Sequence, residues 1–555
     1  MNRPSVPATM PEPSLPFVDL LGGPARLRVN KAGLRQALTF AFSAGGSQDA
    51  LAHALAEAAR ESSLWAKECF ADDLFLGALI ERVLWRSRAA ARSSASVGVR
   101  RYVLSILSSP PAGLQSLEVV RYRQGISAEL MADTTLSGHA AGMVQRIEAL
   151  FELLEAGGVG VRLDPTRRGL DILGALKRVV DEGAHFTQAK SGLSAIAAWS
   201  GATRDSPEYQ RVLDLLDYDG HAATVHLDVR LGRQGELRGM QIVRIAENTQ
   251  NPFYVSVWRR LWGVISLSSR GFRLRRAEVF SRLVHDVFEG MLGAFSAILQ
   301  LLGDLEFYRL GLALGSAARE QGLEVCLPSF VTSGRRIDAL FNPFLLLEER
   351  PPRPCDISNG PGALVVITGP NSGGKTRLLQ ALGMCQVLAQ AGLFVPARAA
   401  ALPWQDGLFA SLSVQPGAEQ REGRLGTELL RIRSMFEKLE VGALVLVDEL
   451  CSGTNPGEAE ELFGMVLDLL AALSAEAFVT THFLEFAARL ALDPPVSVLE
   501  FLRVGLDADK RPTYHFEPGV AESALAQQTA QRLGVTQHEL SALVHAARER
   551  KRLRG

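Results

Sequence analysis

Apolar residues recur with a helical period over most of the first half of the chain. Between about residues 30 and 220 they return every three or four positions, as at Leu34, Leu38 and Phe42. This is the spacing of one face of an amphipathic helix. The same spacing returns between about residues 258 and 322. We therefore expect a mostly helical region before residue 333.

One segment interrupts this helical pattern. Residues 224–231 alternate apolar with polar side chains, and glycines follow directly. Alternation with a period of two is typical of a strand with one buried face, and glycines favour turns. We predict a β-hairpin over about 222–256.

From about residue 336 onward, short apolar runs alternate with helical stretches. The runs at 364–367, 444–447 and 478–480 have the length and composition of buried strands. Strands that alternate with helices are typical of a parallel sheet wrapped by helices. The change of pattern places a domain boundary near residue 333.

Composition narrows the class of protein. The chain has 555 residues, 47% of them apolar, so it can bury several cores, and its formal net charge of -1 gives no global basic surface for nucleic acid. Residues 1–16 are proline-rich without an apolar signal core, and we expect them to be disordered. No apolar stretch is long enough to span a bilayer.

The five cysteines form no CxxC pair. We expect a cytoplasmic protein with neither disulfides nor a zinc site.

A glycine-rich loop follows the apolar run at 364–367. Residues 369–376 read GPNSGGKT and fit the pattern G-x-x-x-x-G-K-[ST]. Glycines let backbone N–H groups converge on phosphates at the positive end of the next helix. Lys375 is expected to reach the β- and γ-phosphates, and the Thr376 hydroxyl to ligate Mg²⁺. We predict a binding site for ATP and Mg²⁺ formed by Gly369, Pro370, Asn371, Ser372, Gly373, Gly374, Lys375 and Thr376.

A pair of carboxylates ends the next buried run. Asp448 and Glu449 follow residues 443–447, about 70 residues after the loop. A carboxylate at the end of a parallel strand beside the loop can hold Mg²⁺, which we assign to Asp448. Glu449 is placed to polarise the attacking water, as a catalytic base. The alternative is a solvated strand end.

A polar triplet ends the third run, where Thr480 and Thr481 precede His482. A histidine at this edge of the sheet can contact the γ-phosphate and respond to its loss. The alternative is a structural histidine. We predict a catalytic role for His482 beside Lys375 and Glu449.

Four segments together resemble one family. Residues 368–376 (TGPNSGGKT), 389–397 (AQAGLFVPA), 448–454 (DELCSGT) and 481–483 (THF) are similar to conserved motifs of the MutS ATPases of DNA mismatch repair. Generic phosphate-loop ATPases do not share the first two motifs together. The resemblance covers about residues 340–540.

The resemblance implies a fold and an assembly. It implies an α+β multidomain protein with a helical core and lever region over 17–333. An α/β P-loop ATPase domain of the ABC type would follow over 334–555. It also implies a homodimer in which the partner's signature loop completes each ATP site, and a helical tail from about 519 to 534 that supports dimerisation.

The sequence departs from the family at three places. Residues 422–428 occupy the signature position, but the family's serine and phenylalanine are replaced. The aromatic residue that stacks on adenine has no clear counterpart: Pro351 and Pro352 lie at about its position, and Phe344 is the nearest candidate. The Phe-x-Glu motif of the mismatch reader occurs only at 483–485, inside the ATPase region, so we do not expect mismatch reading.

Arginines interleaved with aromatic residues form a candidate DNA-binding surface, with a solvated helix face as the alternative. Its members are Arg259, Arg260, Arg270, Arg273, Arg275 and Arg276. We therefore predict a MutS-like ATPase that switches a dimer on DNA, in mismatch repair or a related transaction. The alternative is an ATP-driven, MutS-like regulator of a protein or ribosome complex, or of branched DNA, without mismatch recognition.

Overall fold

The computed structural model describes residues 17–22, 26–29, 31–44, 50–58, 63, 65–86, 95–111, 116–156, 165–221, 223–231, 237–247, 276–348, 351–412, 424–451, 456–522 and 537–552. The chain forms two compact units. The helical unit contains residues 1–59, 90–103 and 128–308, and the sheet unit contains residues 60–89, 104–127 and 309–555. The segment 1–16 lies outside the described residues.

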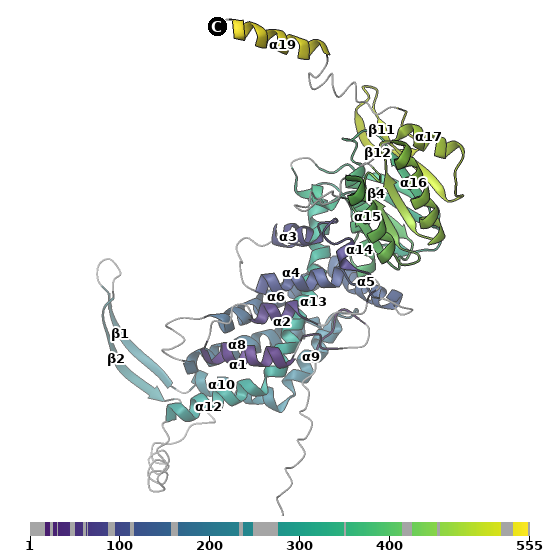
Figure 1. The fold of residues 1–555 in the computed structure, drawn as a ribbon. Coiled ribbons are helices and arrows are strands. Elements are labelled where there is room, and N and C mark those ends of the chain that lie inside the picture. The colour runs from purple at the N-terminus through teal and green to yellow at the C-terminus, as the bar shows by residue number, and fades with distance from the viewer. Residues whose placement is uncertain are drawn as a thin grey trace, which may run out of the picture. The chain divides into compact units, whose positions relative to one another are not determined.

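Helices build the first unit (Figure 1). They are α1 (Lys31–Ala44), α2 (Ala50–Ala56), α4 (Ala95–Leu107), α6 (Thr134–Glu155), α8 (Pro165–Glu182), the 3-10 helix η2 (Gly183–Gln188), α9 (Ser194–Arg204), α10 (Pro207–His221), α12 (Arg276–Gly290) and α13 (Leu292–Glu320). Helices α4, α5 (Ser116–Ala132) and α13 contain residues of both units.

Local sequence explains where α6 begins and which face it buries. Asp133 is its N-cap, and its carboxylate accepts hydrogen bonds from the backbone N–H groups of Thr135 and Leu136. Met143, Ile147 and other residues at helical spacing are buried, and this face packs against α8. The apolar period read from the sequence is thus the core of the helical unit.

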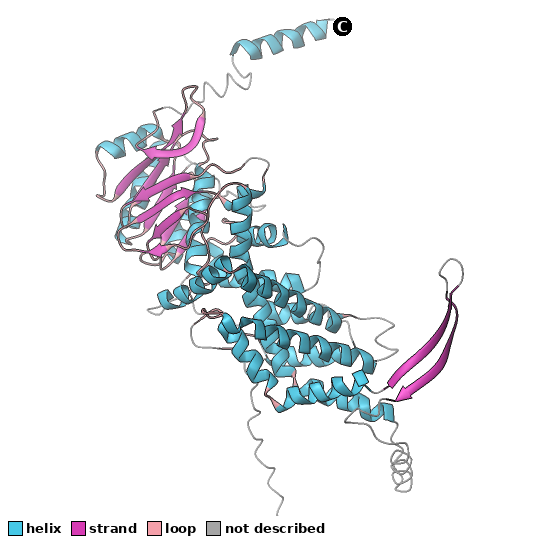
Figure 2. Cartoon of the chain, turned by 180° about the vertical axis from the view of Figure 1, so that it is seen from behind, coloured by secondary structure: helices cyan, strands magenta, loops and turns pink. Residues whose placement is uncertain are grey.

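The alternating segment after residue 222 has an extended backbone. Strands β1 (Ala223–Leu231) and β2 (Leu237–Glu247) pair antiparallel, with register shifts after His226 and Arg230. Figure 2 shows the pair in magenta.

No single helix of the described ranges has the length and apolarity needed to cross a membrane. The segments Leu283–Gly290 and Leu292–Glu320, bent by 51°, meet that test only as a pair and by length and composition alone.

The sheet unit is built on two sheets (Figure 2). The larger has the strand order β12-β11-β6-β10-β9-β8, in which only β12 is antiparallel to its neighbour. Its strands are β6 (Leu364–Thr368), β8 (Leu408–Ser411), β9 (Leu444–Val447), β10 (Glu476–Thr480), β11 (Leu499–Leu506) and β12 (Pro512–Pro518). The three apolar runs predicted as strands are β6, β9 and β10, and they lie side by side at its centre.

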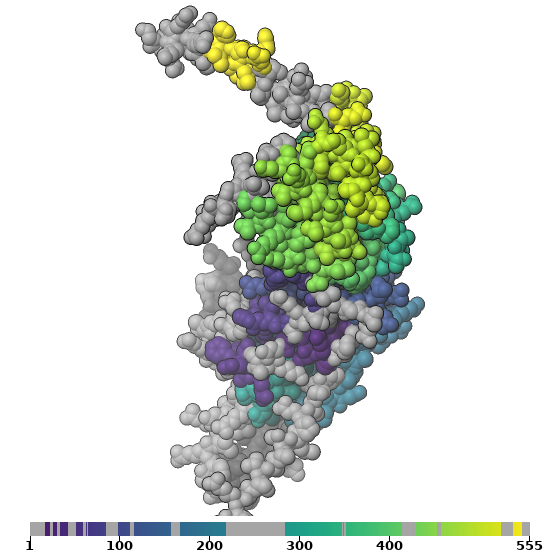
Figure 3. All heavy atoms as spheres, turned by 45° about the vertical axis from the view of Figure 1, so that its right-hand side comes forward, coloured from purple at the N-terminus to yellow at the C-terminus, as the bar shows by residue number. Residues whose placement is uncertain are grey.

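The smaller sheet has the order β3-β7-β4-β5 and is mixed. The sequence patterns did not predict it, because its strands β3 (Ser329–Phe330), β4 (Arg335–Leu340), β5 (Cys355–Asn359) and β7 (Ala399–Leu402) are short and only partly apolar. Helices of the unit include α3 (Leu76–Arg86), α14 (Lys375–Ala391), α15 (Arg424–Lys438), α16 (Pro456–Ala472), α17 (Leu484–Leu492) and α19 (Gln537–Arg552). In Figure 3 the atoms of the later part of this unit form one closely packed green and yellow-green surface.

A buried ion pair joins the two sheets. Arg335 of β4 donates two hydrogen bonds, of 2.9 and 2.7 Å, to the carboxylate of Glu476 in β10. Gln405 and Asn359 each donate a further bond to that carboxylate. Both charges are almost fully buried, so removal of one partner is expected to cost about 3–5 kcal/mol.

The sheet unit also takes in an early part of the chain. Asp73 accepts a hydrogen bond from the backbone N–H of Leu412, and the Trp65 indole donates to the carbonyl oxygen of Gln405. Residues 60–89 therefore pack with residues more than 300 positions later.

Candidate functional site

The carboxyl ends of three parallel strands bring the predicted site residues together. Strand β10 lies between β6 and β9 and is parallel to both. Side chains that follow these strands therefore share one edge of the sheet. The glycine-rich loop follows β6, Asp448 and Glu449 follow β9, and Thr480 ends β10.

Two glycines fix the path of the loop that follows β6. Gly369 has a φ of +137°, and a Cβ at this position would lie 2.7 Å from a methyl carbon of Val504. Gly374 is the left-handed N-cap of α14, with a φ of +86°. Both positions need a residue without a side chain. The backbone N–H groups at the start of α14 consequently face the loop.

Lys375 is buried within this loop, with only 5% of its surface exposed. Its Nζ donates hydrogen bonds to the carbonyl oxygens of Gly369 at 2.9 Å and Pro370 at 3.2 Å. Burial lowers the pKa of Lys375, and the charges of Asp448 and Glu449 oppose that effect. The loop thus holds an amine in a confined space, which suits the binding of an anionic group.

Asp448 lies at the centre of a hydroxyl–carboxylate cluster. The Thr376 hydroxyl donates to its Oδ2 atom, and the Thr480 hydroxyl donates to its Oδ1 atom at 2.5 Å. The Thr480 oxygen also accepts the backbone N–H of Glu449 at 2.8 Å. Hydroxyl and carboxylate oxygens are ligands that Mg²⁺ prefers. The arrangement fits a magnesium ion beside the loop.

Thr480 is the member of this cluster to which the sequence interpretation gave no role. A threonine at the end of a buried strand is common, and its hydroxyl has no motif of its own. Its position in the sequence could have indicated a role in the site, because Thr480 is the last residue of the strand that precedes His482.

Glu449 and His482 lie at the same edge with different degrees of constraint. Glu449 has a φ of +50°, a left-handed backbone that is unfavourable outside glycine and that clusters at functional sites. His482 is exposed, and its ring lies 4.2 Å from that of Phe483. In the described part of the chain, no hydrogen bond links the His482 side chain to Lys375, Asp448 or Glu449.

A cavity of about 730 Å³ opens beside the end of the loop. Gly374, Arg377, Pro351 and Pro352 line it, together with the aromatic residues Phe341, Tyr514 and Phe516. Tyr514 lies against the loop, since a Cβ on Gly374 would be 3.2 Å from its ring. Phe344 is not among the lining residues, and its ring instead packs near Phe75.

Residues 365–552 match the family described as MutS domain V. This range begins in β6 and includes the glycine-rich loop, the Asp448 cluster and α19. This part of the chain is a MutS-family domain.

Similar proteins carry the name Endonuclease MutS2. The one from Thermus thermophilus is 32% identical over 285 residues, which is 50% of this chain and 37% of that protein. The one from Thermomicrobium roseum is 29% identical over 288 residues, 49% of this chain and 36% of that protein. The one from Lactiplantibacillus plantarum is 34% identical over 177 residues, 31% and 22% of the two chains. The chain therefore spans less than two fifths of these relatives' lengths.

Three predicted features of the chain lie wholly or largely outside the described residues, one of them the helical tail over 519–534, of which residues 523–534 are not described. Residues 413–423 precede α15, and the side chains of Thr427 and Glu428 are not described, which leaves the signature position a prediction. Of the six candidate DNA-binding arginines, only Arg276 belongs to a described element, as the first residue of α12, and its side chain is not described.

Proposed function

We propose that the protein binds and hydrolyses ATP with Mg²⁺ at the carboxyl ends of β6, β9 and β10. The observation that carries this proposal is the juxtaposition of the buried Lys375 amine with the Thr376–Asp448 pair. A cation inside a loop at a helix N-terminus suits a polyphosphate, and the oxygen pair suits its magnesium ion.

The loop residues bind and orient the phosphates. Lys375 exchanges its bonds to the carbonyls of Gly369 and Pro370 for the β- and γ-phosphate oxygens. The backbone N–H groups from Asn371 to Thr376 surround the same oxygens. Mg²⁺ at this site would neutralise part of the phosphate charge. Thr376 and Asp448 hold the ion.

The strand ends supply the hydrolytic groups. Glu449 orients and deprotonates the attacking water. The Thr480 hydroxyl bonds both the Asp448 carboxylate and the backbone N–H of Glu449. It therefore holds the magnesium ligand and the catalytic base at a fixed distance from each other. His482 contacts the γ-phosphate from the end of β10 and responds to its loss.

The cavity beside the loop holds the nucleobase. Tyr514 lies against Gly374 and offers a ring face for stacking, a role the sequence had left without a clear candidate. The side chain of Arg353 lies over that ring at 5.6 Å and limits its movement.

Replacement of the base tests the proposal most directly. Glu449→Gln should keep ATP affinity and lower turnover by roughly 10²-fold or more, because a neutral amide cannot take the proton. Single-turnover hydrolysis and nucleotide binding are measured together. Glu485→Gln, an exposed glutamate of the same unit, is the control and should hydrolyse at the wild-type rate. Wild-type turnover in Glu449→Gln would show that Glu449 is not the base.

We also propose that the active form is a dimer, as the resemblance to the MutS ATPases implies. Helix α19 follows the predicted tail, and its exposed leucines Leu540 and Leu543 are an apolar surface that supports a contact between two copies. Light scattering should give a dimer mass at micromolar concentration, more completely with ATP. A monomer under both conditions would refute the dimer while leaving the ATP site untouched.

DNA is the proposed partner of this dimer. Contacts from the arginines between 259 and 276 would go to phosphates, which position a duplex without reading its sequence. Affinity should then fall steeply with salt, with less than about threefold preference for a mismatch over homoduplex.

A triple substitution tests this surface. Arg273, Arg275 and Arg276 replaced by alanine should lower the salt slope by about three. The matched control replaces the exposed Arg336, Arg433 and Arg511 of the sheet unit. If wild-type protein shows no salt-dependent binding to homoduplex, mismatched or branched DNA, the alternative function is favoured, a regulator of a protein or ribosome complex. The endonuclease activity in the relatives' name is not proposed, because the shared region covers only part of those proteins.

A further inference from the structure

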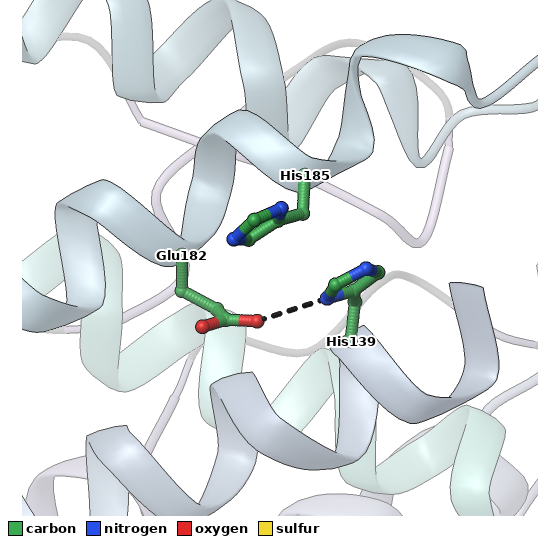
Figure 4. A group of neighbouring side chains, drawn as sticks. All are labelled: His139, Glu182 and His185. Atoms are coloured by element: carbon green, nitrogen blue, oxygen red, sulfur yellow. Dashed lines mark hydrogen bonds and ion pairs between the residues drawn. The ribbon is translucent and has the colours of Figure 1, made fainter. Parts of the chain in front are cut away.

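Three potential metal ligands converge in the helical unit, whereas the proposed ATP site belongs to the sheet unit. Figure 4 shows His139 on α6 facing Glu182 and His185. Their ligand atoms all lie within 4.8 Å of one another. Glu182 ends α8 and His185 lies in η2, directly after it. None of these residues belongs to the ATP-binding loop or to the predicted DNA surface.

The local fold explains why these residues meet. Glu182 and His185 are three positions apart across the junction of two consecutive helices, and such a spacing places both side chains on one face. Glu-x-x-His is also a spacing used by metal-binding helical bundles. Helix α6 packs against α8 and brings His139 from 43 positions earlier to the same face.

The distances suit a small divalent ion. His139 Nδ1 and Glu182 Oε1 are 3.1 Å apart. Two ligands at Zn–N and Zn–O distances of about 2.0–2.2 Å in a tetrahedral site are about 3.3 Å apart. These two ligands thus already have nearly the separation that a zinc ion requires.

The carboxylate is held ready by a second group. Arg146 Nε donates to Glu182 Oε2 at 2.6 Å, and Oε1 is hydrogen-bonded to His139 Nδ1 at 3.1 Å, a bond that a metal ion between these two atoms would replace. Glu182 is 6% exposed. Groups that bond the far oxygen of a ligating carboxylate orient it and favour its charged form. Gly142 of α6 lies near Glu182 and does not crowd the carboxylate. Even a Cβ added at this glycine would be 3.5 Å from Oε1, an ordinary van der Waals distance.

The two imidazole rings of the group lie against each other. They are stacked, with centroids 4.4 Å apart and planes at 4°. A metal ion lies in the plane of each ring that binds it. Binding therefore needs rotation of one ring, and His185 can rotate because it is exposed.

We propose that His139, Glu182 and His185 form a binding site for a zinc-class divalent cation, with an open fourth coordination position. Three protein ligands of this kind leave one position of a tetrahedral zinc ion to water or to a donor from a partner. The ion joins α6 to the α8–η2 junction and so stabilises the helical unit. The expectation that the chain has no zinc site, drawn from its cysteines, did not consider histidines and carboxylates on separate helices.

The test uses the full chain, freed of metal and held in excess Mg²⁺ to saturate sites made of oxygen ligands. Zn²⁺ alone is titrated by calorimetry, and Co²⁺ is added separately to record the absorption of a tetrahedral site. We expect one Zn²⁺ per chain, a rise in melting temperature, and tetrahedral Co²⁺ bands.

His185→Ala is the principal variant, because its side chain is exposed and its loss should not disturb folding. It should weaken Zn²⁺ binding by about tenfold or more and abolish the tetrahedral bands. The matched control is His53→Ala, an exposed histidine that pairs with Glu57 in the same unit without a second histidine. Equal Zn²⁺ affinity in wild type, His185→Ala and His139→Ala would overturn the proposal, as would no Zn²⁺ binding by the wild type.

Discussion

The proposed ATP site of the sheet unit and the proposed metal site of the helical unit, called the histidine site below, are built in opposite ways. The ATP site takes its residues from short segments that each follow a strand, and adjacent parallel strands deliver their ends to one edge. The histidine site takes its residues from faces of separate helices. The first arrangement leaves readable motifs in the sequence, whereas the second leaves only scattered residues.

Both sites nevertheless use the same device to hold a charge. Lys375 is buried among loop carbonyls, and Glu182 is buried against Arg146. In each case the surrounding polar groups orient the charged atom before a ligand arrives, which reduces the reorganisation that binding requires. Because the two sites share no residue, we expect ligand binding at one site to leave ligand affinity at the other unchanged.

The largest effect is expected from Lys375→Ala. Loss of charge-assisted hydrogen bonds should raise the dissociation constant for ATP roughly 30- to 150-fold, while Zn²⁺ binding to the helical unit stays unchanged. Fluorescent nucleotide binding and zinc calorimetry on one preparation measure both. Lys438→Ala, an exposed lysine of the same unit, should change neither. A parallel loss of Zn²⁺ binding in Lys375→Ala would mean that the two sites are coupled.

A smaller effect is expected from Tyr514→Ala. Loss of base stacking should raise the dissociation constant for ATP about tenfold, and Tyr514→Phe should restore it because the ring face is kept. Phe344 is the aromatic residue that the sequence had suggested for stacking on adenine, so Phe344→Leu distinguishes it from Tyr514. Its ring does not line the cavity, so ATP affinity should hold. The assignment fails if Phe344→Leu weakens ATP binding and Tyr514→Ala does not.

The smallest effect is expected from Arg146→Gln, which removes the group that orients Glu182. Arg146 is half exposed, so we expect Zn²⁺ affinity to fall about fivefold, below the usual range for groups behind a ligand. ATP turnover should remain at the wild-type level. Unchanged Zn²⁺ affinity would show that Glu182 needs no orientation by Arg146.

Particular residues show which parts of the fold and of the site could be predicted from the sequence. The strands β6, β9 and β10 were predicted because each is a run of apolar residues buried on both faces. Lys375 and Asp448 were predicted to serve one site because each has a fixed place in a motif. Thr480 received no role, since its importance comes from two hydrogen bonds that join separate strands.

The sequence by itself determined the features that depend on residues close together in the chain. A loop with positive φ needs glycines in a fixed order, and a strand buried on both faces needs an unbroken apolar run, so these features appear as patterns. Only the tertiary structure decided which distant residues meet. Pairing of β12 with β11 places Tyr514 against Gly374, and packing of α6 on α8 places His139 beside Glu182. Such contacts depend on how whole elements pack, and packing between elements has no fixed spacing along the chain.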